Sequence, residues 1–149
     1  MTSTRAIQRF LAAPAIAVVG VSRKSHKFGN AACRTLRDKG YRIYQIHRHA
    51  TTIDDHEFFP RLADVPERVE SVLIVVPHWE TLDVIREAAA AGARHVWLQQ
   101  GAESVASINL ATSLGLDVVA GECVLMFANP TGIHRLHRGL RQLVGGVTT

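Results

Sequence analysis

The stretch AIAVVGVSRKSHKFGN, residues 15–30, decides the fold of this chain. Residues 15–20 are all apolar or Gly, which predicts a short strand that is buried on both faces. Gly20 ends the strand where a side chain would obstruct a tight turn. A polar segment follows before a helical pattern starts at Gly29, and its side chains include Ser22, Arg23 and Lys27. A strand, a Gly turn, a cationic loop and a helix N-terminus together predict a phosphate site, because backbone N–H groups and the positive end of the helix dipole converge there.

Strand patterns recur along the chain, and helical patterns separate most of them. We expect strands at 15–20, 41–46, 72–76, 95–98 and 116–120, and helices at 4–12, 30–39, 79–91 and 104–114. This alternation implies βαβ units with right-handed crossovers. We therefore predict an α/β, doubly wound (Rossmann-like) fold with a five-stranded parallel sheet, flanking helices and an extra C-terminal amphipathic helix at 131–144. The turn-rich segment 47–66 is expected to add a short extended piece at 57–59 and one helical turn near Arg61-Leu62. Residues 1–149 form a single domain.

Composition limits the classes of function. An apolar fraction of 47% and a charged fraction of 20% over 149 residues are typical of one globular domain. The net charge of +4 suits a small polyanionic ligand, whereas nucleic-acid binding is disfavoured because Lys and Arg never form a run longer than two. No apolar run approaches the roughly 20 residues that span a bilayer. We expect a cytoplasmic protein that binds neither membranes nor nucleic acid.

The carboxyl ends of the strands supply the candidate site, since open parallel sheets bind ligands there, near the switch in strand order. The segment after the first strand departs from the dinucleotide fingerprint GxGxxG. It has the first Gly of that motif, Gly20, but the next Gly in the chain is Gly29. The second strand ends in His47-Arg48-His49, where NAD binding would favour an Asp or Glu for the ribose hydroxyls. A ligand that carries an additional ribose phosphate, such as coenzyme A or NADP, is therefore favoured over NAD.

Several segments resemble the stand-alone CoA-binding domain family, over about residues 6 to 127. They read VVGVSRKSHKFGN, GYRIYQIHRHA, LIVVP, GARHVWLQQGAES and LGLDVVAGECVLM. Members are small cytoplasmic Rossmann-type proteins, similar to the N-terminal CoA-binding domain of the succinyl-CoA synthetase α subunit. The resemblance implies that coenzyme A or an acyl-CoA is the ligand. It implies a loop against the diphosphate and ribose that consists of Gly20, Val21, Ser22, Arg23, Lys27, Phe28 and Gly29. It places Val76 and Pro77 beside the adenine or pantetheine, and Gln100 and Gly101 near the pantetheine arm.

Two departures from the family pattern matter. Members often show Val-Asn-Pro where this chain has Ile46-His47-Arg48, so a contact of His47 and Arg48 with the 3′-phosphate rests on their charge. The tail after Met126 extends past the matched part. The chain ends where a synthetase would continue into its catalytic domains, so we expect no acyl-CoA synthesis by this polypeptide and name no catalytic residue.

The remaining chemistry-bearing side chains have mainly structural interpretations. Cys33 is expected in the core, as are Trp79 and Trp97. Cys123 follows the last strand and faces the presumed crevice, where its thiol either stays buried or forms a mixed disulfide with pantetheine. A metal site from His47, His49 and His56 is disfavoured because the spacing does not suit a tetrahedral site.

Three functions remain open from the sequence. The first is a non-catalytic CoA-binding carrier, sensor or partner module. The second is an NADP-binding oxidoreductase or redox module that uses the same crevice. The third is a protein-interaction module with a vestigial nucleotide crevice, whose C-terminal helix docks an unidentified protein partner or a second copy in a homodimer.

Overall fold

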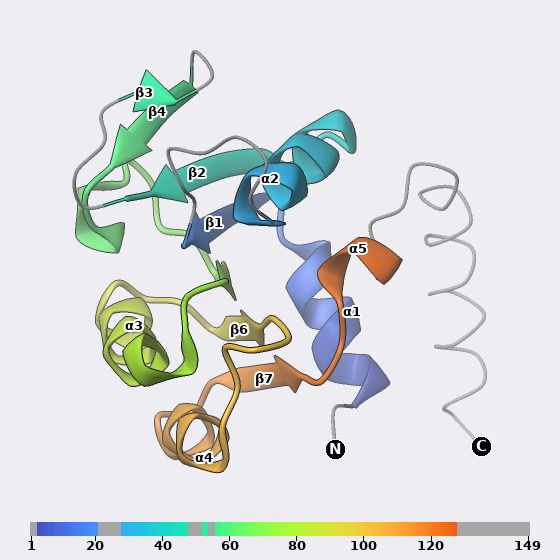
Figure 1. Cartoon of the computed structure of the whole chain (residues 1–149), viewed down its shortest axis with the longest axis vertical. Coiled ribbons are helices and arrows are strands. Elements are labelled where there is room, and N and C mark those ends of the chain that lie inside the picture. Colours follow the sequence, from blue (N-terminus) through green and yellow to red (C-terminus); the bar gives the residue numbers. More distant parts are fainter. Residues whose placement is uncertain (1–2, 21–27, 48–51, 54–55, 128–149) are drawn as a thin grey trace.

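The computed structural model describes residues 3–20, 28–47, 52–53 and 56–127. Its centre is a seven-stranded sheet of order β3-β4-β2-β1-β5-β6-β7 (Figure 1). The strands are β1 (Ala15–Val19), β2 (Arg42–Ile46), β3 (Thr52–Ile53), β4 (His56–Phe59), β5 (Ser71–Ile74), β6 (His95–Leu98) and β7 (Asp117–Ala120). The chain moves outward from β1 in one direction through β2, then returns to pair β5 with the other side of β1. The predicted doubly wound α/β fold is confirmed.

Six of these strands are parallel, so the prediction of five is wrong by one. The additional strand is β4, in which Phe58 and Phe59 pair with Gln45 and Ile46 of β2. Only β3 runs antiparallel, along the outer side of β4. Because β4 has four residues and lies in a polar, turn-rich segment, its pattern indicates an extended piece but not which strand it joins.

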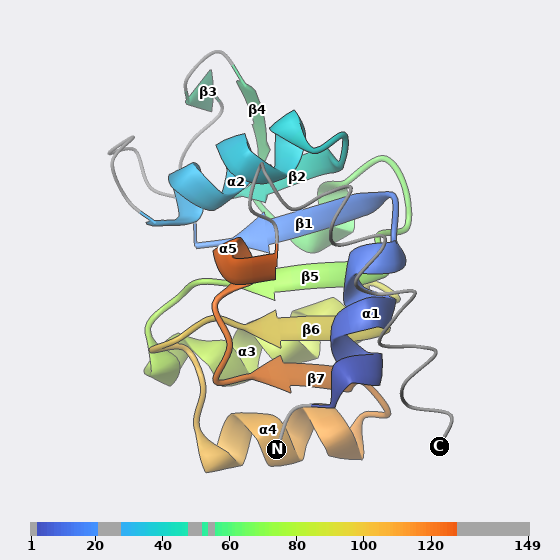
Figure 2. The ribbon, with the colours of Figure 1, turned by 90° about the vertical axis from the view of Figure 1, so that its right-hand side faces the viewer.

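Helices cover both faces of the sheet (Figure 2). One face packs against α1 (Thr4–Ala12), α2 (Phe28–Asp38) and the short α5 (Val124–Phe127). The other face packs against the 3-10 turn η1 (Leu62–Asp64), α3 (His78–Ala90) and α4 (Val105–Ser113). Among the described residues, none of these helices has both the length and the apolar character that crossing a bilayer requires. The C-terminal helix expected at 131–144 lies outside the described residues.

Local sequence accounts for most of the element boundaries. All five residues of β1 are buried, as expected for a strand between two others with helices on both faces. The Ser3 side chain caps α1 by accepting a hydrogen bond from the Ala6 amide, 3.1 Å away. In α4, Ser104 and Ser107 form a reciprocal capping box. These elements agree with the predicted ranges to within two residues.

Gly20, which follows β1, lies in close contact with the backbone that follows β5. Its φ is +113°, and a Cβ placed there would lie 2.5 Å from the carbonyl oxygen of Val75 and 3.0 Å from the amide of Val76. Both of these atoms belong to the backbone that leaves β5. The contact therefore lies at the switch point of the sheet, and it allows no side chain at residue 20.

Replacement of Gly20 by Ala should destabilise the protein by on the order of 3 kcal/mol, because it adds a backbone clash to an unfavourable φ. Gly40 is a matched control: its φ is +93°, but no atom lies within 4 Å of the position of its Cβ. Gly40→Ala should cost only about 1 kcal/mol. Urea unfolding of the two variants measures the difference, and equal losses would show that the close approach is absent.

Cys33 is fully buried on the inner face of α2, as predicted. Burial raises the pKa of its thiol from 9.0 to about 12, against the smaller opposing influence of Arg37 and Arg34. Between these two pH values the unfolded chain loses the thiol proton while the folded protein keeps it. The contribution of this group to stability is therefore constant below pH 9 and falls as the pH rises toward 12.

The free energy of unfolding should consequently decline more steeply between pH 9 and pH 10.5 in the natural chain than in Cys33→Ala. The two slopes should differ by up to about 1.4 kcal/mol per pH unit. Tyr and Lys residues titrate in both proteins, so comparing the slopes isolates the thiol. Parallel curves would contradict the burial of Cys33.

Candidate site at the carboxyl edge of the sheet

A cavity of about 480 Å³ lies at the carboxyl edge of the sheet, at the switch point. Its floor is formed where β1, β2, β4 and β5 end, and α3 forms one wall. The lining residues are Val19, Gly20, Ile46, His47, Pro60, Val76, Trp79, Glu80, Asp83, Val84 and Glu87. Strand ends from both halves of the fold therefore converge on one space.

Three of the predicted site residues line this cavity together. They are Gly20, His47 and Val76, one from each of the ends of β1, β2 and β5. The backbone of His47 is fixed by its amide, which donates to the carbonyl of Phe59 at 3.0 Å. Its ring meets Phe58 edge-on, with centroids 6.3 Å apart. The sixth parallel strand thus positions the end of β2 within the site.

Other predicted residues do not line this cavity. Pro77 is the N-cap residue of α3, and its carbonyl accepts from the Glu80 amide at 2.9 Å. Phe28 and Gly29 open α2, where Gly29 is buried and Phe28 packs against the core. The predicted contacts of Val21, Ser22, Arg23, Lys27 and Arg48 fall outside the described residues.

The predicted residues after β6 and β7 belong to a neighbouring part of the edge. Gln100 and Gly101 are exposed, and the Gly101 amide donates to the Glu103 carboxylate at 2.8 Å. Cys123 is partly exposed. The buried Gln99 joins these two loops, since its Oε1 accepts from the Val124 amide at 3.1 Å. These residues do not line the cavity beside α3.

The wall contributed by α3 was missed by the sequence analysis. The prediction that Trp79 is a core residue is wrong: it is 73% exposed, whereas Trp97 is fully buried as expected. A helical period that buries Thr81, Val84 and Ile85 turns residue 79 toward solvent, so the signal was present in the sequence. The same wall carries three carboxylates, of Glu80, Asp83 and Glu87.

These charges distinguish the two helix N-termini beside the cavity. The first turn of α3 contains Glu80, which disfavours an anion there. The first turn of α2 contains no acidic residue. Asp83 is partly neutralised by Arg86, whose Nη1 lies 3.1 Å from its carboxylate. The geometry therefore favours phosphate on the α2 side of Gly20 and an uncharged, hydrogen-bond-donating group on the α3 side.

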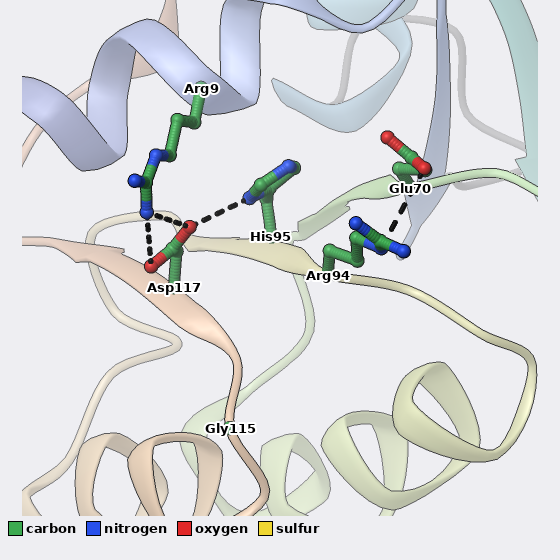
Figure 3. A pocket seen from close by; sticks show the side chains of 6 residues that line it. All are labelled: Arg9, Glu70, Arg94, His95, Gly115 and Asp117. Atoms are coloured by element: carbon green, nitrogen blue, oxygen red, sulfur yellow. Dashed lines mark hydrogen bonds and ion pairs between the residues drawn. The ribbon is translucent and has the colours of Figure 1, made fainter.

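A second cavity, of about 610 Å³, lies at the opposite, amino edge of the sheet (Figure 3). Asp117 accepts from Arg9 at 3.2 Å, and its Oδ2 lies 3.1 Å from His95 Nδ1. Arg94 faces Glu70, with 3.7 Å between the nearest nitrogen and oxygen. Each charged side chain here is close to one of opposite sign, so the cluster joins α1, β6 and β7 and leaves little net charge for a ligand.

The residues that could hold a metal remain scattered. Within the described ranges, His, Cys, Asp and Glu side chains form no group of three or more that could bind a metal ion. His49, one of the three histidines considered from the sequence, lies outside those ranges.

Comparisons with solved structures support the same fold. A hypothetical protein from Pyrococcus horikoshii OT3 superposes with a TM-score of 0.77 at 25% sequence identity, and the match covers 85% of this chain and 89% of that one. The dinucleotide-forming acetyl-coenzyme A synthetase 1 of Ca. Korarchaeum cryptofilum gives a TM-score of 0.62 at 30% identity. That match covers 70% of this chain but only 25% of the synthetase.

Sequence comparisons identify the family. The acetate–CoA ligase (ADP-forming) II of Archaeoglobus fulgidus is 30% identical over 79 residues, which are 52% of this chain and 12% of the ligase. The chain thus matches a small part of the length of that relative. A family model described as a CoA binding domain matches residues 14–129, which include every strand and the cavity. The chain belongs to the CoA binding domain family.

Proposed function

We propose that this chain binds coenzyme A or an acyl-CoA at the carboxyl edge of its sheet, without catalysis, as a carrier, sensor or partner module. The observation that carries the proposal is the cavity at the switch point, which Gly20, His47 and Val76 line together in a member of a CoA-binding family. Because Gly20 has no side chain, a ligand can lie directly against the backbone there. The nucleotide part of CoA would enter at this point.

The distribution of charge supports one orientation of the ligand. The diphosphate would lie toward the start of α2, where no acidic side chain stands in the first turn. The second strand offers His47 and then Arg48, and no carboxylate, for a phosphate on the ribose. We propose that Val21, Ser22, Arg23 and Lys27 complete the diphosphate contacts, and that Arg48 binds the 3′-phosphate.

The pantetheine arm would extend along the edge toward the ends of β6 and β7. This direction passes from Val76 and Pro77 toward Gln100, Gly101 and Cys123, in the order in which β5, β6 and β7 adjoin. The loop after β6 is held by Thr81, whose hydroxyl donates to the Ala102 carbonyl at 2.7 Å. The arm would therefore meet a fixed surface.

The lining of the cavity supports binding without chemistry. Its described residues include no Ser, Thr, Cys or Lys that could act as a nucleophile. A role as carrier, sensor or partner module requires only that the chain binds CoA or an acyl-CoA.

Isothermal titration should show that the protein binds CoA and binds dephospho-CoA more weakly. The difference arises because dephospho-CoA lacks the phosphate that His47 and Arg48 would contact. NADPH provides the discriminating comparison, since it shares the ribose phosphate but not the pantetheine. Absence of CoA binding would refute the proposal, and tighter binding of NADPH than of CoA would favour a redox module.

Arg48→Ala should weaken CoA by about 1.5–3 kcal/mol and leave dephospho-CoA nearly unchanged, because a charge-assisted bond to the 3′-phosphate is lost. Arg42→Ala is the matched control. Arg42 begins β2, the strand that ends two residues before Arg48, and pairs with Glu67 at 2.9 Å, so CoA affinity should not change. If Arg48→Ala weakens both ligands equally, Arg48 does not contact the 3′-phosphate.

A further inference from the structure

Trp79 has an unusual position for the largest type of apolar side chain. Four large apolar residues are exposed among those the structure describes, and of these only Trp79 lines the carboxyl-edge cavity. It lies in the first turn of α3, two residues after Pro77. Its neighbour His78 meets it edge-to-face, with ring centroids 5.1 Å apart. An indole exposed beside a cavity offers a large flat surface for a ligand ring.

The other walls of the cavity suit a flat, uncharged ring. Val19, Val76 and Val84 provide apolar surface, and Gly20 lets a ring approach the backbone. The carboxylates along α3 repel phosphate, so the part of a nucleotide beside this helix is the base. A carboxylate accepts hydrogen bonds and donates none. The matching edge of a base is therefore one that carries an amino group.

We propose that Trp79 recognises the adenine ring of the bound nucleotide by stacking, while the Glu80 carboxylate accepts a hydrogen bond from the exocyclic amino group of adenine. This inference rests on the proposed CoA-binding function and adds the residues that hold the base.

The test measures CoA and 4′-phosphopantetheine, which has no base, by isothermal titration. Stacking on an aromatic side chain predicts that Trp79→Ala weakens CoA roughly tenfold to hundredfold. The affinity for 4′-phosphopantetheine should stay the same, because that probe does not reach the indole. Trp79→Phe should retain most of the CoA affinity, since a smaller aromatic ring remains.

Val105→Ala is the matched control. Val105 is 77% exposed in the first turn of the neighbouring helix α4 and does not line the cavity. CoA affinity should stay within twofold of that of the natural chain. The high exposure of Trp79 also predicts that Trp79→Ala unfolds at the same urea concentration as the natural chain, so a loss of affinity would not reflect misfolding.

The hydrogen bond to the base is measured separately with ADP. Glu80→Ala should weaken ADP binding several-fold, because the amino group of adenine loses its acceptor. Unchanged CoA affinity in Trp79→Ala, or a parallel loss for 4′-phosphopantetheine, would overturn the inference while CoA binding itself stands. No CoA binding by the natural chain would instead refute the proposed function on which it rests.

Discussion

The structure depends on one steric constraint, the contact between Gly20 and the backbone of Val75 and Val76. A Cβ at residue 20 would stand 2.5 Å from the Val75 carbonyl oxygen, so the two central strands end in backbone-to-backbone contact. This contact brings the end of β1 against the start of the connection to α3. It also leaves the space between β2 and α3 open as the cavity. The same missing side chain thus allows the two halves of the sheet to meet and lets a ligand lie against the backbone.

The two sides of the cavity differ in charge. The first turn of α2 carries no acidic residue, while the wall made by α3 carries three carboxylates and an exposed indole. In the proposed complex the diphosphate therefore lies on the α2 side and the base on the α3 side. The amino-edge cavity differs, because its Arg, His and carboxylate side chains lie against one another. That arrangement is suited to holding α1 on the sheet.

Local patterns predicted those features of the fold that short segments encode. The uninterrupted apolar run of β1 and the helix α1 are examples, because patterns within a few residues decide them. The sixth parallel strand was not predictable in this way, since β4 is defined by pairing of Phe58 and Phe59 with a strand that ends ten residues earlier.

Local sequence patterns also predicted part of the candidate site. Gly20, His47 and Val76 end predicted strands, and the sheet rule places such ends together. The α3 wall comes from a helix, where the exposed direction depends on the period of the buried residues. Treating Trp79 as core followed from residue type alone, whereas burial of Thr81, Val84 and Ile85 places it outside. For Cys33, by contrast, residue type and position on the helix both predicted burial, and that prediction was right.

A crystal structure of the chain grown with CoA would show where each part of the ligand lies. We expect the adenine between Val76 and Trp79, and the diphosphate against Gly20 and the start of α2. Electron density for the nucleotide at the amino edge, beside Arg9 and Asp117, or phosphates placed against the carboxylates of α3, would contradict this placement.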